Sequence, residues 1–164
     1  IIVRSRITGQ LHALKQTGCK SGRDKTEGQL LSMLSHPQVI GFTDEVRLSD
    51  RALLVTELCS LGSLQSLIDD FGALHEAASA WFTKHMVEGV AYLHRHGISH
   101  EDLKPSNCLL QRSSEHGVVL KLADFGCSAW KKGTAARNKL VGTPAYMAPE
   151  STSSSASRRK VDIW

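Results

Sequence analysis

The stretch that decides the fold is His100-Glu101-Asp102-Leu103-Lys104-Pro105-Ser106-Asn107. Two further segments stand downstream of it, Asp124-Phe125-Gly126 and Gly142-Thr143-Pro144-Ala145-Tyr146-Met147-Ala148-Pro149-Glu150. Asp124 follows Asp102 by 22 residues. A lone Asp-Phe-Gly means little, but three such segments in this order and at this spacing argue strongly against chance. They therefore mark one functional unit of the chain.

Together the three segments resemble the catalytic loop, the metal-binding motif and the end of the activation segment of eukaryotic-type serine/threonine protein kinases. The resemblance implies an α+β, bilobal protein kinase-like fold in truncated form. The small β-rich N-lobe would span residues 1–58 without a glycine-rich loop, and residues 59–164 would form the hinge and the first part of the helical C-lobe through the activation segment. The implied activity is phosphoryl transfer from ATP, with magnesium, to serine or threonine hydroxyls of protein substrates.

The chemistry of this reaction explains the residue types in the loop. Its transition state is anionic, so catalysis depends on positioning and on neutralising charge. By the resemblance, Asp102 would accept or orient the proton of the substrate hydroxyl, and Lys104 would neutralise the γ-phosphate. Thr143 would hydrogen-bond toward both, and Lys104 with Thr143 favours serine/threonine over tyrosine specificity. The competing interpretation, an ordinary surface Asp and Lys, is weak beside the combined motifs.

Magnesium and the phosphates would be held by residues from both halves of the chain. Asn107 and Asp124 offer the hard oxygen ligands that magnesium prefers, and Gly126 would let the chain turn after the metal ligand. Lys15 stands where kinases carry the lysine that holds the α- and β-phosphates, and Glu27 where they carry its helix partner. The gap of 12 residues between them is shorter than usual, which predicts a helix trimmed at its start or a strained pair.

The segment Leu53–Cys59 resembles the strand that leads into the kinase hinge. The resemblance implies that adenine hydrogen-bonds to backbone groups of Glu57 and Cys59 and lies between Ala13 and Leu109. Thr56 falls at the gatekeeper position, and as a β-branched residue it also suits a strand. The family further implies a stack linking the lobes, formed by Leu31, Phe42, His100 and Phe125. In that stack His100 would be structural rather than a base.

Hydrophobic periodicity and turn residues predict the elements. The predicted strands lie at 1–3, 10–15, 39–46 and 52–58, with a turn at 8–9 and a loop at 16–23. Helices are predicted from about 24 to 34, at 63–71 and, most strongly, at 75–94, and a small hairpin at 108–110 and 118–122. Strands first and helices afterwards predict two segregated lobes rather than a parallel sheet.

Composition narrows the function classes. The net charge is +4, but aromatic residues make up only 5% of the chain, so we expect no nucleic-acid partner. No apolar stretch approaches the roughly 20 residues of a membrane span. The cysteines are scattered without a C-x-x-C pair, which argues against a disulfide framework or a zinc site and favours the reducing cytoplasm. Nothing in the sequence predicts an oligomeric state.

Glu101 is the main departure from the family pattern. Kinases that are switched on by activation-loop phosphorylation carry arginine there, and Glu101 would repel a phosphate. We hypothesise that Glu101 instead pairs with Lys131, Lys132, Arg137 or Lys139 and holds the loop; a solvent-facing Glu101 without effect is the alternative. A Glu101→Arg variant with unchanged, phosphate-independent activity would contradict the pairing. Ser63 and Ser106 replace acidic residues of arginine-directed kinases, which weakens a preference for basic substrates.

Two further questions concern activity and subgroup. A pseudokinase or scaffold that binds nucleotide or partners without turnover is the alternative function, although none of the expected catalytic residues is missing. Because the glycine-rich loop and the later helices are missing, we expect the 164-residue chain alone to be unstable and inactive; a cooperative melt with measurable phosphorylation would contradict this. Residues 62–64, 71–74 and 121–128 resemble MAP-kinase-kinase-kinase enzymes, whereas 105–106 and 145–146 look closer to calmodulin-kinase-like sequences.

Overall fold

A computed structural model describes residues 1–18, 27–115, 117–130, 142–152 and 158–164. Its strands are β1 (Ile2–Arg4), β2 (Leu11–Gly18), β3 (Phe42–Arg47), β4 (Arg51–Glu57), β5 (Ile98–Ser99), β6 (Cys108–Ser113), β7 (Gly117–Leu122) and β8 (Ala129–Trp130). Its α-helices are α1 (Glu27–Leu31), α2 (Leu64–Phe71), α3 (Glu76–Arg95) and α4 (Arg158–Val161). Short 3₁₀ turns lie at Pro105–Asn107, Phe125–Cys127, Pro144–Tyr146 and Pro149–Thr152.

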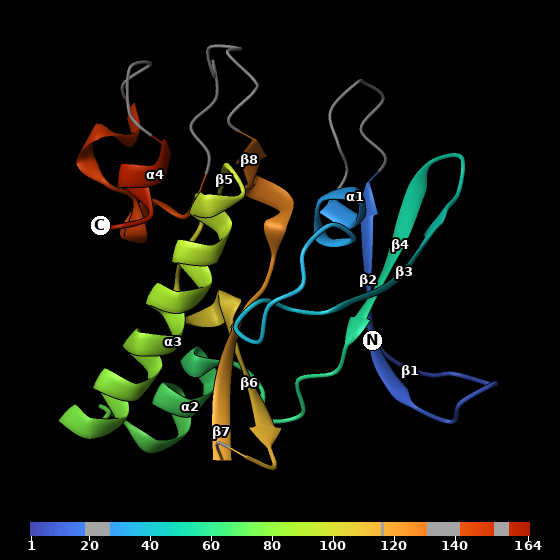
Figure 1. Cartoon of the computed structure of the whole chain (residues 1–164), viewed down its shortest axis with the longest axis horizontal. Coiled ribbons are helices and arrows are strands. Elements are labelled where there is room, and N and C mark those ends of the chain that lie inside the picture. The colour runs from blue at the N-terminus through green and yellow to red at the C-terminus, as the bar shows by residue number, and fades with distance from the viewer. Residues whose placement is uncertain (19–26, 116, 131–141, 153–157) are drawn as a thin grey trace.

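The first strands form an antiparallel sheet in the order β1-β2-β4-β3, with α1 beside it (Figure 1). In its register, Lys15 pairs with Leu54 and Leu54 pairs with Glu45, so these three side chains share one face. Ala52 and Leu54 on this face are buried, and Leu30 and Leu31 of α1 are buried as well. The sheet and α1 therefore close a small core over the face that carries Lys15.

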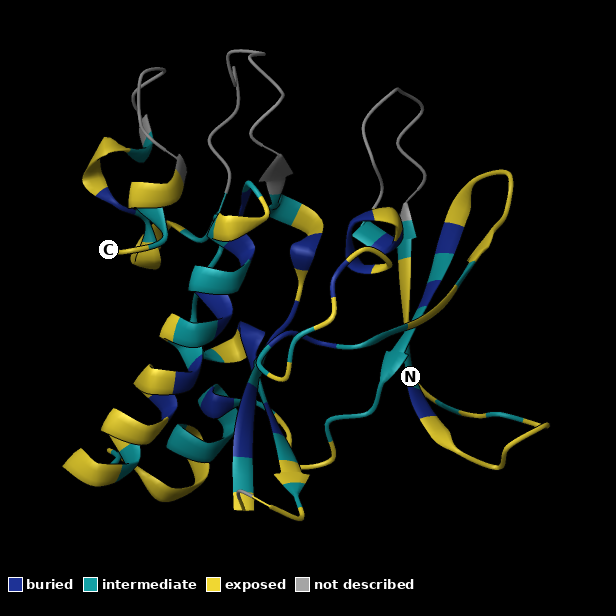
Figure 2. Cartoon of the chain, in the orientation of Figure 1, coloured by how far each residue is buried: buried dark blue, intermediate teal, exposed yellow. Residues whose placement is uncertain are grey.

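The remaining elements are mostly helical and lie apart from this sheet (Figure 1). The long helix α3 packs against β7 of the antiparallel β6–β7 hairpin. Phe82, Val90 and Leu93 of α3 are buried, and dark blue segments of α3 and the hairpin mark this core in Figure 2. The α+β segregation that the sequence predicts is thus confirmed.

The segment after α1 joins the two parts of the core. Ile40 N donates to Leu122 O, and Leu122 N donates to Gln38 O, both at 2.9 Å. The predicted strand at 39–46 is therefore wrong at its start, because residues 38–40 pair with the end of β7 and the sheet strand begins only at Phe42. An apolar run cannot reveal which partner strand it meets.

Other predicted boundaries hold with small shifts. Residues 16–18, expected in a loop, continue β2, because they pair with β4 in register. The described part of the helix predicted from 24 to 34 covers Glu27–Leu31 only. Helix α2 begins after Ser63, whose hydroxyl accepts from Ser66 N at 3.1 Å and caps the helix. No helix among the described residues is long and apolar enough to cross a membrane.

Candidate active site

The Asp102 carboxylate is held by three side-chain donors. Thr143 Oγ1 donates to Oδ1 at 2.8 Å, while Lys104 Nζ and Asn107 Nδ2 donate to Oδ2 at 2.8 and 3.0 Å. Lys104 Nζ also lies 2.6 Å from Thr143 Oγ1. Thr143 is 41 residues from Asp102 in sequence, so the fold brings the two segments together. The expected hydrogen bonds of Thr143 to Asp102 and Lys104 are both formed.

The surroundings of Asp102 stabilise its ionised form. Burial opposes ionisation, but the hydrogen bonds from Lys104 and Thr143 outweigh it and lower the pKa of Asp102 below its usual value. A carboxylate with a lowered pKa holds a proton poorly. The geometry therefore suits orientation of a hydroxyl better than storage of its proton.

A second group of charges surrounds Lys15. Its Nζ lies 2.9 Å from Glu27 Oε2 and 2.7 Å from Asp124 Oδ1. Burial works against the charged amine, but the hydrogen bonds to Asp124 and Glu27 prevail and raise the pKa of Lys15. Glu27 Oε1 also accepts from Phe125 N at 3.0 Å. The Glu27 carboxylate thus joins β2, α1 and the Asp124-Phe125-Gly126 segment despite the short gap from Lys15.

The backbone at Asp124 differs from the expectation. Asp124 itself adopts the left-handed conformation, with φ 64° and ψ 76°, whereas Gly126 is not among the residues with positive φ. The prediction that Gly126 makes this turn is therefore wrong. Asp124 can adopt this conformation because its own carboxylate accepts from Gly126 N at 3.4 Å, a local bond that short polar side chains allow.

The residues around Asp124 fit a magnesium–nucleotide complex. The Asn107 amide donates through Nδ2 to Asp102, which leaves Oδ1 as its acceptor atom. Two carboxylates, Glu27 and Asp124, share the one cation Lys15, so the group has excess negative charge. Within the described ranges, no cluster of three or more His, Cys, Asp or Glu side chains could hold a metal ion by itself. Magnesium would therefore need phosphate oxygens besides Asn107 and Asp124.

The expected adenine-binding residues lie on adjoining elements. Ala13 pairs with Thr56 across β2 and β4, and Leu109 forms an isolated bridge with Ser63. Glu57 N donates to Gly41 O at 3.0 Å, and the Glu57 carbonyl accepts from Thr56 Oγ1 at 3.3 Å; this oxygen has a second lone pair that would serve adenine.

Two side chains of the expected hinge are fixed by their surroundings. The Glu57 side chain points away to Lys121 Nζ at 2.9 Å and to Gly41 N at 2.6 Å. Burial, with Glu57 nearby, raises the pKa of Cys59 to about 11, so this thiol is a weak nucleophile at neutral pH.

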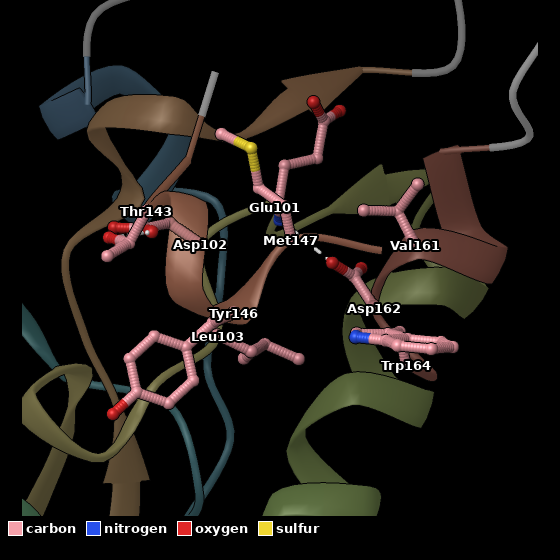
Figure 3. A pocket seen from close by; sticks show the side chains of 9 residues that line it. All are labelled: Glu101, Asp102, Leu103, Thr143, Tyr146, Met147, Val161, Asp162 and Trp164. Atoms are coloured by element: carbon pink, nitrogen blue, oxygen red, sulfur yellow. Dashed lines mark hydrogen bonds between the residues drawn. The ribbon is translucent and has the colours of Figure 1, made fainter. Parts of the chain in front are cut away.

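Asp162 is a site residue that the sequence did not assign. Its side chain is only 1% exposed and accepts from His100 N at 2.9 Å and from Glu101 N at 2.8 Å. His94 Nε2 lies 2.7 Å from the same carboxylate. Figure 3 shows Asp162 beside the catalytic loop, near Val161 and Trp164, which line the same pocket as Asp102 and Thr143. Because 61 residues separate Asp162 from Glu101, only the fold brings them together.

Glu101 adopts a left-handed backbone with φ 66°. Its Oε1 accepts from Ser99 Oγ at 2.8 Å, and its side chain points away from the Asp102 carboxylate in Figure 3. The basic residues at 131–139 that were expected to pair with it lie outside the described residues. The pairing therefore stays a prediction.

His100 is buried and structural. Its Nε2 lies 3.0 Å from Ala123 O, its Nδ1 accepts from Asp102 N at 3.3 Å, and its ring lies 4.9 Å from that of Phe125. Phe125 and Leu31 belong to one core cluster, against which Phe42 packs. These contacts join the four residues of the expected stack. Burial lowers the pKa of His100, with Asp162 opposing the shift, and the neutral ring satisfies both of its bonds.

Stability is expected to fall as the pH drops below about 6.5, the ordinary pKa of histidine. Because the folded pKa of His100 is lowered, the unfolded chain binds a proton that the folded chain refuses, so stability falls from there down to the folded pKa. Urea unfolding at pH 7.5 and 5.5 should show the loss, and His100→Phe should reduce the pH dependence. His36→Phe is the matched comparison: burial also lowers the pKa of His36, but that ring is only partly buried, so the variant should change the pH dependence less than His100→Phe does. An unchanged slope in His100→Phe would contradict this origin.

Comparison with known proteins agrees with this geometry. The model of the protein kinase domain matches residues 2–164. Mitogen-activated protein kinase kinase kinase 3 of Arabidopsis thaliana is 34% identical over 96% of this chain and 26% of that protein. Ovarian-specific serine/threonine-protein kinase Lok of Drosophila melanogaster is 38% identical over 84% of this chain and 29% of that protein. Myosin light chain kinase A of Dictyostelium discoideum is 36% identical over 85% of this chain and 47% of that protein. The chain thus spans less than half of each relative.

Proposed function

The chain belongs to the protein kinase domain family, and we propose that it is the nucleotide-binding and catalytic part of an active serine/threonine kinase. The observation that carries this proposal is the double set of contacts at the site. One set holds Asp102 through Thr143, Lys104 and Asn107, and the other joins Lys15 to Glu27 and Asp124. The lobes of this proposal are residues 1–58 and residues 59–164, which meet at the hinge after Glu57.

In the proposed mechanism, each residue acts on the acceptor or on the phosphates. Asp102 accepts a hydrogen bond from the substrate hydroxyl and directs its oxygen toward the γ-phosphate. Lys104, held beside Asp102 by Thr143, neutralises charge that develops on the transferred group. Lys15, aimed by Glu27, holds the α- and β-phosphates. Bound magnesium would neutralise phosphate charge, and Asn107 and Asp124 would hold it.

The adenine end of ATP would lie between Ala13 and Leu109. There it would bond to the Glu57 carbonyl and to the backbone of Cys59, with Thr56 behind it. These residues come from β2, the end of β4 and β6, so the pocket lies between the sheet and the hairpin.

The proposed substrates are proteins with serine or threonine acceptors, and the proposed role is signalling. The likeness to mitogen-activated protein kinase kinase kinases favours that subgroup, although the other two relatives bear other names. The cytoplasm is the proposed location, because Cys59 and Cys108 form no disulfide and suit a reducing compartment.

A phosphorylation assay separates an active kinase from a pseudokinase. We expect the full-length protein, with magnesium and ATP, to phosphorylate serine or threonine in a positional peptide library. Asp124→Asn should lower this activity by about 100-fold, because it removes a charged magnesium ligand. Asp70→Asn, an exposed change on α2, is the control and should leave activity unchanged. A wild-type protein that binds ATP without turnover would establish the pseudokinase instead.

A further inference from the structure

Glu45 is an acidic residue that points toward the core side of the sheet. It pairs with Leu54 across β3 and β4 and therefore shares the face that carries Lys15. Its side chain is only 10% exposed. Arg47 Nε donates to Glu45 Oε2 at 2.8 Å, and this ion pair keeps the carboxylate in one orientation. The mechanism proposed above gives Glu45 no role.

Helix α1 meets this side chain at its glycine. Gly28 is buried. A Cβ atom added to it would lie 2.6 Å from Glu45 Cδ and 3.1 Å from Cγ, and closer still to Oε1. Outside the neighbouring residues and backbone of α1, the three described atoms nearest to such a Cβ all belong to Glu45, so Glu45 occupies the space that a side chain at position 28 would fill. Helix and strand are thus in close contact through a glycine and a carboxylate.

We propose that Gly28 and Glu45 are positioning residues that set α1 against β3 and so aim Glu27 at Lys15. Gly28 directly follows Glu27, so the depth at which Gly28 meets Glu45 fixes where the Glu27 carboxylate lies. That carboxylate lies 2.9 Å from Lys15 Nζ and 3.0 Å from Phe125 N. A displacement of α1 would change both contacts. The link to ATP affinity rests on the proposed function; the contact itself does not.

The direction in which Gly28→Ala changes the stability of α1 tests the contact. Glycine inside a helix is ordinarily unfavourable, so Gly→Ala at a site with room increases helix stability. At Gly28 the proposal expects the opposite, because the added methyl group meets the Glu45 carboxylate. That side chain is only 10% exposed and is paired with Arg47, so it can make room only by moving together with the ion pair. In a Glu45→Ala background that carboxylate is gone, and the same methyl group should help to fill the space.

The experiment measures this coupling in the full-length protein. Hydrogen exchange of the amides in residues 27–34 should become about ten-fold faster in Gly28→Ala, and the KM for ATP should rise about five-fold while the KM for peptide stays constant. In the Glu45→Ala background, Gly28→Ala should instead slow exchange and lower the KM for ATP. If Gly28→Ala folds only in that background, the result is the same in stronger form.

Two control variants separate this contact from a general loss of stability. Arg47→Gln keeps the carboxylate in the contact and should change exchange of α1 less than Gly28→Ala does. Val90→Ala, in the core of α3, should lower the melting temperature without raising the KM for ATP. Three results would each overturn the proposal. The first is slower exchange of α1 in the single variant Gly28→Ala, and the second is the same change in exchange and in the KM for ATP whether position 45 is Glu or Ala. The third is a rise in the KM for ATP in Val90→Ala as large as that in Gly28→Ala. If wild type has no turnover, the proposed function fails, and exchange still decides the contact.

Discussion

Asp102→Asn in the full-length protein is expected to lower kcat by about 1,000-fold, within the range for an acid–base group positioned at the reaction. The amide has nearly the shape of the carboxylate, but it lacks the charge and presents an NH2 group on one side. Either Thr143 or the pair of Lys104 and Asn107 would then face a donor instead of an acceptor. The substrate hydroxyl would also lose the charged acceptor that orients it. Steady-state kinetics with peptide and ATP measure the loss.

The KM for ATP should stay within about two-fold in this variant, because the proposed phosphate-binding group around Lys15 does not include Asp102. Ser106→Ala is the matched control, since Ser106 is an exposed residue of the same loop. It should retain wild-type kcat. More than a tenth of wild-type activity in Asp102→Asn would mean that Asp102 is structural and that another group orients the acceptor.

Much of this site could be predicted because its residues lie in short local motifs. Asp102, Lys104 and Asn107 are close in sequence, so one loop conformation brings them together. The periodic leucines of α1 and the mixed faces of α3 indicate helices for the same local reason. Long-range pairs such as Lys15 with Asp124 follow only from the family resemblance, since 109 residues separate them.

The features that could not be predicted depend on packing between distant segments. Residues 38–40 form no part of the sheet because β7 offers them a closer partner, and hydrophobicity does not encode that choice. The left-handed turn falls on Asp124 rather than on Gly126 because a side-chain hydrogen bond stabilises it locally. From the sequence alone Glu45 is an ordinary polar residue of an exposed strand, and only the structure shows that α1 packs against it. In each case the conformation depends on a partner that is remote in sequence or on a small difference in local free energy.

Asp162→Asn is expected to lower the free energy of unfolding by about 3 kcal/mol, the usual cost of breaking a buried, hydrogen-bonded charge. The Asp162 side chain is buried and takes donors on both oxygens: Glu101 N on Oδ1, and His100 N with His94 Nε2 on Oδ2. An asparagine can accept on one side only, so its NH2 group must face at least one of these donors. Urea unfolding of the full-length protein measures the loss. A variant within about 0.5 kcal/mol of wild type would contradict this account.

The hydrogen bonds of Asp162 should also hold the strained backbone of the catalytic loop. Glu101 has φ 66°, which costs a residue with a side chain about 1–2 kcal/mol, and Asp162 bonds the amides of Glu101 and of the preceding His100. Without these bonds the turn should relax and move Asp102 away from its hydrogen-bond partners, so kcat should fall along with stability. Glycine adopts positive φ without strain, so Glu101→Gly should favour the original turn again and raise kcat about five-fold in the Asp162→Asn background, the equivalent of about 1 kcal/mol. Glu101→Gly also removes the Ser99 hydrogen bond, so the same change in wild type is the control; Asp162 already holds the turn there, and kcat should not rise. Equal effects of Glu101→Gly in the two backgrounds would show that Asp162 does not hold the turn.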